Sequence, residues 1–149
     1  MCRTNAEDIH RSSRITKLKI MKIEKKYHFY AAHRNKKADE KCGRIHGHTY
    51  KVKCIFEFTE MKDGVTMLFG DIDKITEPII KQYDHYFLLF EKDTLCEILD
   101  LANEPYISLP FQTSAENMAI WIFNQIKREL PIIEIQLAET ETSKIIYNG

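Results

Sequence analysis

Apolar and polar positions alternate along two segments in the first half of the chain, and this period of two predicts β-strands. On the first strand, within residues 23–33, the shared face carries Ile23, Tyr27, Phe29, Ala31 and His33. On the second, within residues 46–58, it carries His46, His48, Tyr50, Val52, Cys54, Phe56 and Phe58. The sequence MKDG at residues 61–64 is typical of a turn and ends the second strand.

Further along the chain, a period near 3.6 replaces the alternation and predicts two helices. The first is indicated by the spacing of Ile72, Ile75, Ile79 and Tyr83, with a bend at Pro78. The second covers TSAENMAIWIFNQIKREL at residues 113–130, where Thr113 and Glu116 have the spacing of a capping box. Residues 91–111 lie between them: TLCEILDLA is compatible with a short helix, and the two prolines of NEPYISLPF predict a loop.

The C-terminal sequence IIEIQLAETETSKIIYNG predicts a closing hairpin with a turn near residues 142–143. One face of it carries Ile133, Ile135, Leu137, Glu139 and Glu141. The order strand, strand, helix, helix, strand, strand predicts an α+β domain with its helices on one face of an antiparallel sheet. Regular patterning begins at residue 21, so we assign residues 1–20 to an N-terminal extension and 21–149 to the domain.

Composition narrows the functional classes. The 149 residues include 22 basic and 22 acidic side chains, so the charge balance indicates neither a nucleic-acid partner nor a membrane surface. No apolar run approaches the roughly 20 residues of a membrane span, and the N-terminus lacks the apolar segment of a secretory signal. We therefore expect a soluble, cytoplasmic protein. The four cysteines form no CxxC pair, which favours reduced thiols, with Cys54 and Cys96 in the core.

Three histidines point to a metal site. His46 and His48 lie two residues apart on one strand, and His33 has the same orientation on the neighbouring strand. Three imidazoles suit zinc and leave a fourth position for water or substrate. The HxH pattern alone is weak, because two ordinary histidines at a strand end produce it too.

Cys42 permits two interpretations. Its sulfur could complete a closed site with the three histidines, which would be structural. Alternatively it could stay off the metal as a thiolate, with its pKa lowered by zinc and by Lys41 or Arg44.

Two acidic positions also suggest chemistry. Asp84 precedes His85 and could orient its imidazole, although from these two residues alone a helix-end pair without chemistry is the favoured interpretation. Glu139 is turned inward by the strand alternation, and a buried charge needs a partner. A planar ligand with two adjacent N–H donors, such as the edge of a guanine or a pterin, would match the carboxylate. The alternative is that this face opens to solvent at the strand end.

Four segments together resemble the 6-pyruvoyl-tetrahydropterin synthase family, in the same order: FYAAHRNKKADEKCGRIHGHTYKV, DIDKITEPIIKQYDHYFL, TSAENMAIWIF and LAETETSKIIY. The resemblance covers about residues 21–147. The short spacing from Cys42 to His46 resembles the bacterial 6-carboxytetrahydropterin synthases of queuosine biosynthesis. The resemblance implies a tunnelling fold (T-fold), in which each subunit has a four-stranded antiparallel sheet and two helices. It also implies that three sheets form a barrel, that two trimers stack into a homohexamer, and that active sites lie between subunits.

The resemblance implies a role for each candidate residue. It matches one Zn²⁺ per subunit to His33, His46 and His48, the catalytic residues to Cys42, Asp84 and His85, and pterin contacts to Glu139, Thr113 and Ser114. The implied activity is that of a carbon–carbon lyase, which converts 7,8-dihydroneopterin triphosphate to 6-carboxy-5,6,7,8-tetrahydropterin, acetaldehyde and triphosphate. The alternatives are a pyruvoyl-forming synthase or related pterin side-chain lyase, and a non-catalytic zinc-stabilised binding module.

The chain also departs from the family pattern. Leu68 stands where the family commonly has an aspartate, and Gln112 stands where it commonly has a proline. The segment 89–111 is longer than in compact bacterial members. None of these departures falls on an expected metal or catalytic position.

Overall fold

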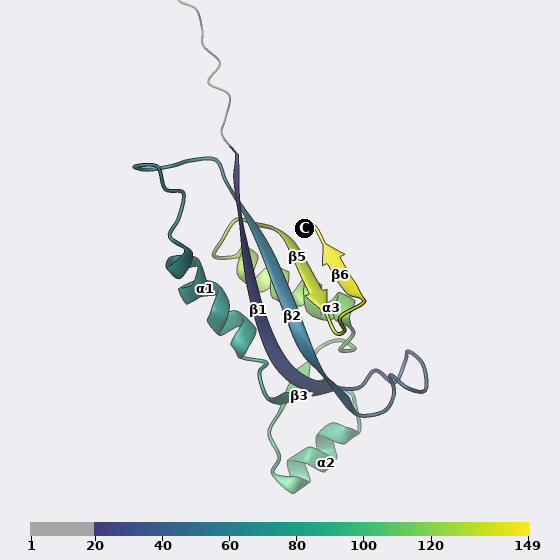
Figure 1. Ribbon diagram of the computed structural model, residues 1–149. Helices are drawn as coiled ribbons and strands as arrows, with labels where there is room; N and C mark the ends of the chain where they lie inside the picture. Colours follow the sequence, from purple (N-terminus) through teal and green to yellow (C-terminus); the bar gives the residue numbers. More distant parts are fainter. Residues whose placement is uncertain (1–19) are drawn as a thin grey trace, which may run out of the picture.

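Two long strands form the centre of the computed structural model, which describes residues 20–149 (Figure 1). The predicted extension, residues 1–20, lies outside the described residues except for its last position. β1 (Met21–His33) and β2 (His46–Phe58) pair antiparallel along their full length, with His33 opposite His46. The predicted alternation is confirmed, because Phe29 and Ala31 on β1 and Tyr50 on β2 are buried on one face. The three histidines lie at one end of that face.

Within residues 20–149 the sheet has six strands, in the order β4-β3-β1-β2-β5-β6. The additional members of the sheet are β3 (Tyr86–Phe90), β4 (Tyr106–Leu109), β5 (Ile132–Ala138) and β6 (Lys144–Tyr147). β3 runs parallel to β1 and β4 runs parallel to β3, whereas the other pairings are antiparallel. The expected α+β class is therefore confirmed, and the expected four-stranded, fully antiparallel sheet is wrong.

β3 and β4 show why the strand prediction fell short. Leu88 and Leu89 in β3 are both fully buried, so its sequence YFLLF has no apolar-polar alternation to detect. The expected loop at residues 103–111 is wrong, because Pro105 and Pro110 flank Tyr106–Leu109 instead of interrupting it. β4 is an edge strand, the position in a sheet where neighbouring prolines are tolerated.

Three helices are present among the described residues, one more than the predicted pair. α1 (Phe69–Lys81) and α3 (Ala115–Lys127) pack against the same face of the sheet and against each other. α2 (Leu95–Ala102) confirms the possible short helix and lies beyond the end of the sheet near β3 (Figure 1). None of the helices at residues 20–149 is long and apolar enough to cross a membrane.

Two local details of the prediction also change. Ser114, one residue beyond the predicted cap Thr113, is the N-cap of α3, and its hydroxyl accepts a hydrogen bond from the Asn117 N–H at 3.3 Å. At the start of β5, Ile132 is buried together with Ile135 and Leu137, and the predicted Ile133 is not, because the pairing register shifts opposite residues 55–56 of β2.

Candidate functional site

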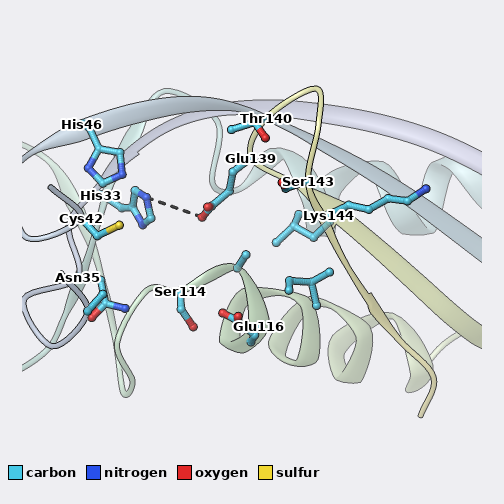
Figure 2. Close-up of a pocket in the computed structure, with 14 residues that line it drawn as sticks. His33, Asn35, Cys42, His46, Ser114, Glu116, Glu139, Thr140, Ser143 and Lys144 are labelled. Atoms are coloured by element: carbon cyan, nitrogen blue, oxygen red, sulfur yellow. Dashed lines mark ion pairs between the residues drawn. The ribbon is translucent and has the colours of Figure 1, made fainter.

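A cavity of about 360 Å³ opens where the end of β1, the loop 34–45, the start of α3 and the β5–β6 turn meet (Figure 2). Its polar lining consists of His33, Asn35, Cys42, His46, Ser114, Glu116, Glu139, Thr140, Ser143 and Lys144. Cavities of this size commonly hold small molecules. Most of the residues predicted to carry chemistry line this cavity or lie directly behind it.

His33, His46 and His48 form a cluster in which one nitrogen from each ring lies within 4.8 Å of the other two. The register of the central hairpin produces this cluster, since His33 lies directly opposite His46 and His48 follows two residues later on the same face. The ring centroids are 4.5 Å apart for His33 and His46, 5.1 Å for His33 and His48, and 4.9 Å for His46 and His48.

Hydrogen bonds to backbone carbonyl oxygens orient two of the imidazoles. Nδ1 of His33 lies 2.6 Å from the carbonyl oxygen of Thr113, and Nδ1 of His46 lies 2.8 Å from that of Arg44. Donation from Nδ1 leaves Nε2 without a proton and able to bind a metal. Nε2 of His33 and Nε2 of His48 are buried and have no hydrogen-bond partner among the described residues. Because an unpartnered buried nitrogen is costly, the cluster fits a metal ion that would satisfy it.

Burial favours the neutral form of His33 and of His48. It lowers the pKa of His33 to about 4, reinforced by the neighbouring histidines and opposed by the hydrogen bond to Thr113. Burial likewise lowers the pKa of His48. The dashed contact of 3.8 Å in Figure 2 therefore joins a neutral His33 imidazole to the carboxylate of Glu139. Neutral imidazole is the form that binds metals, so His33 and His48 are prepared for one near pH 7.

Glu139 directly follows β5, and its carboxylate points into the cavity (Figure 2). This confirms the predicted inward orientation. The Tyr50 hydroxyl donates a hydrogen bond of 3.4 Å to Oε1 of Glu139, and the Glu139 side chain is 26% exposed. The carboxylate thus faces the open space of the cavity, where it could accept hydrogen bonds from a ligand.

Cys42 lines the same cavity but does not belong to the group of possible metal ligands, which within residues 20–149 contains the three histidines alone. Its backbone N–H donates to Oδ1 of Asp39 at 2.7 Å. A hydrogen bond between the thiol and Asp39 raises the pKa of Cys42, and burial and the charge of Glu139 raise it further. The expectation that Lys41 or Arg44 lowers this pKa is therefore wrong for the protein chain alone, because carboxylates act on the thiol.

The two residues before α3 have different positions. Ser114 lines the cavity as well as capping the helix. Thr113 is fully buried behind His33, where its carbonyl orients the imidazole and its hydroxyl donates to the Arg34 carbonyl at 3.3 Å. The structure thus places Ser114, and not Thr113, where it could contact a ligand in the cavity.

Asp84 and His85 contact each other but do not line this cavity. Oδ1 of Asp84 accepts the Tyr30 N–H at 2.8 Å, and Oδ2 lies 3.1 Å from Nδ1 of His85. These contacts, the Tyr30 N–H first, lower the pKa of Asp84. The His85 ring lies 5.5 Å from that of Tyr30, on the sheet face opposite the buried one, and His85 has φ of 64°. Positive φ in a non-glycine residue is strained and is often kept for function.

Sequence reasoning did not assign roles to several cavity residues. The sequence predicts Glu116 as a capping residue only. Its place in the first turn of α3, beside Ser114, puts it in the cavity wall as well. Lys144 lies opposite Ala138 in the β5–β6 pairing, and its ammonium donates to Gln136 at 2.7 Å. The hairpin register could have indicated Lys144, whereas Asn35 lies in a loop without any period.

Comparison with known proteins gives the same family as the sequence motifs. A family model described as 6-pyruvoyl tetrahydropterin synthase matches residues 22–149. The chain is 33% identical over 139 residues to a 6-carboxy-5,6,7,8-tetrahydropterin synthase of Haemophilus influenzae, covering 86% of this chain and 99% of that protein. It is 30% identical over 103 residues to a dihydroneopterin monophosphate aldolase of Pyrococcus furiosus, covering 69% and 72%.

Among solved structures, the 6-pyruvoyl tetrahydropterin synthase of Caenorhabditis elegans superposes with a TM-score of 0.67 at 22% identity. The match covers 89% of this chain and 97% of that chain, and it supports the tunnelling fold expected for the subunit. The motifs, the fold and the match over residues 22–149 lead to one conclusion. This chain belongs to the 6-pyruvoyl tetrahydropterin synthase family.

Proposed function

We infer that this protein is a zinc-dependent 6-carboxy-5,6,7,8-tetrahydropterin synthase. It would convert 7,8-dihydroneopterin triphosphate and water to 6-carboxy-5,6,7,8-tetrahydropterin, acetaldehyde and triphosphate, in queuosine or related 7-deazaguanine biosynthesis. One observation carries the proposal: the three-histidine cluster, the Cys42 thiol and the Glu139 carboxylate meet around one cavity of about 360 Å³. The name of the Haemophilus influenzae relative supports this activity over others in the family.

The cavity is suited to a flat, polar ring. Glu139 can accept two parallel N–H bonds from the amidine-like edge of a pterin, and such charge-assisted pairs are stronger than neutral ones. Leu137 and Ile145 line the cavity beside it and provide apolar contact for the ring. Ser114 and Glu116 on the α3 side offer further polar groups.

The chain's own groups would bind the metal and move protons. His33, His46 and His48 would hold Zn²⁺, which when bound would supply a Lewis acid for substrate oxygens. Cys42 Sγ would exchange a proton with the substrate side chain. The negative charge of Glu139 raises the pKa of the Cys42 thiol. Hydrogen bonds from the ring N–H groups to Glu139 would weaken this effect and so favour loss of the thiol proton.

Asp84 and His85 would act in an assembled oligomer. Within one chain the pair lies on the other face of the sheet from the cavity, so it would serve the site of a neighbouring subunit. The hexamer of two trimers implied by the family resemblance would provide that neighbour. In it, His85 would transfer a proton on the side of the substrate away from Cys42 and Asp84 would hold its imidazole.

A second candidate is another pterin side-chain lyase, which the similarity to the Pyrococcus furiosus aldolase favours. The two can be separated by product analysis after incubation of the purified zinc-loaded protein with 7,8-dihydroneopterin triphosphate. Acetaldehyde with 6-carboxytetrahydropterin supports the proposal. Loss of triphosphate alone would identify a pyruvoyl-forming synthase, and no turnover together with a zinc–sulfur distance of about 2.3 Å would identify a closed binding module.

A further inference from the structure

A tight turn in the loop 34–45 carries Cys42 into the cavity. Oδ1 of Asp39 accepts the Cys42 N–H at 2.7 Å, and the Asp39 carbonyl accepts the Gly43 N–H at 2.9 Å. On the other side, the Asn35 N–H donates to the Cys42 carbonyl at 2.7 Å. The Cys42 main chain is therefore held at both its donor and its acceptor.

The turn has little room and little apolar support. A side chain at Gly43 would place a Cβ atom 3.2 Å from the Asp39 carbonyl oxygen, which is closer than ordinary van der Waals contact. Residues 36–41 are exposed, so burial does not hold this segment in place. The direction of the Cys42 side chain consequently depends on the hydrogen bonds of the turn.

Asp39 and Glu40 are neighbouring acidic residues with different contacts. Oδ1 of Asp39 accepts the Cys42 N–H, which places the carboxylate beside Cys42, and this carboxylate raises the pKa of the thiol. Glu40 instead pairs with Arg44 on the surface, where its side chain is 84% exposed. Only one of the two acidic residues thus acts on Cys42, and the other provides a matched control.

We propose that Asp39 is the positioning residue of Cys42: its carboxylate accepts the Cys42 N–H and holds the turn so that the sulfur faces the bound substrate. The proposal rests on the proposed function, in which Cys42 moves a proton. It assigns a role to a loop residue that lies outside the metal cluster and the Glu139 anchor. Asp39 acts through Cys42 and does not itself touch the substrate.

The test compares Asp39→Ala, Asp39→Asn and Glu40→Ala in the full-length zinc-loaded protein. Asparagine retains an oxygen for the Cys42 N–H and removes the charge, whereas alanine removes both. The readouts are kcat and KM with 7,8-dihydroneopterin triphosphate, zinc content, and the pH dependence of iodoacetamide labelling of the Cys42 peptide by mass spectrometry. The labelling readout does not depend on the proposed activity and separates Cys42 from the other cysteines.

We expect Asp39→Ala to lower kcat by at least about tenfold with KM and zinc content unchanged, because small misplacements of a reacting group are costly. Asp39→Asn should keep kcat within about threefold, and Glu40→Ala should match the unsubstituted protein. The labelling midpoint should move to lower pH in both Asp39 variants and stay in place in Glu40→Ala.

Unchanged kcat in Asp39→Ala, or an unchanged labelling midpoint in Asp39→Asn, would overturn the proposal. A shifted midpoint in a protein that never turns over 7,8-dihydroneopterin triphosphate would support the Asp39–Cys42 contact and overturn the proposed function instead.

Discussion

Replacing Glu139 by glutamine tests the proposed pterin anchor most directly. The change keeps the shape of the side chain and one acceptor oxygen, and it replaces the second oxygen by an N–H donor. The Tyr50 hydroxyl, 3.4 Å from Oε1, can still donate to the amide oxygen. We therefore expect the free energy of unfolding to change by less than about 0.5 kcal/mol, while the affinity for the ligand falls.

The magnitude follows from the lost hydrogen bond. A hydrogen bond to a charged group contributes about 1.5–3 kcal/mol, and Glu139→Gln loses one such bond and turns an N–H toward a donor on the ring. Since the side chain is 26% exposed, water partly competes and a value of about 2 kcal/mol is appropriate. This corresponds to a fall of about 30-fold in kcat/KM.

The assay measures kcat/KM for 7,8-dihydroneopterin triphosphate together with urea unfolding. Glu141→Gln is the control, because Glu141 lies two residues further on, is 80% exposed and pairs with Lys51 on the surface. Exposed pairs of this kind contribute little, so the control should stay within about twofold of the unsubstituted protein. Equal kcat/KM for Glu139→Gln and Glu141→Gln would refute the anchoring role.

Three further predictions concern the histidines and the assembly. In the zinc-free protein the folded-state pKa of His33 is about 4 against 6.5 for the free side chain, so the unfolded chain binds the proton first as the pH falls. The free energy of unfolding should therefore be highest above pH 6.5 and fall by about 3 kcal/mol between pH 6.5 and pH 4, at about 1.36 kcal/mol per pKa unit. Urea unfolding midpoints measured across this pH range check the prediction, and midpoints that do not change with pH contradict it. The His46→Ala protein should lose zinc to a chelator that leaves zinc in the His28→Ala protein, because His28 is exposed on the other face of the sheet. Elemental analysis measures the zinc content after chelator treatment, and equal zinc content in the two variants would argue against the site. Co-refolding inactive Cys42→Ala and His85→Ala chains should restore about a quarter of full activity if each site combines two subunits, whereas no recovery would place both groups on one chain.

The sequence predicted the central hairpin and its site well, for a physical reason. Side chains on a regular strand alternate between faces, so the parity of His33, His46 and His48 was readable before any pairing was known. The same rule turned Glu139 inward. The cluster needed only that the two strands be neighbours, which a short connection makes common.

The sequence was less informative where burial or loop geometry decides. β3 and β4 are short and not alternating, and their parallel pairing joins segments distant in the chain. Asp39 lies in a loop, where no period marks which of two adjacent carboxylates turns toward Cys42.

Residue type and strand parity therefore predicted the grouping of the three histidines and the inward carboxylate, the order of the elements predicted the α+β class, and the four motif segments indicated the family. The tertiary structure decided how the groups combine. It left Cys42 outside the histidine cluster, placed the Asp39 carboxylate against the Cys42 N–H, and put Asp84 and His85 on the opposite face of the sheet. These outcomes depend on loop geometry and on distances between segments far apart in sequence, which hydrophobic periodicity does not encode.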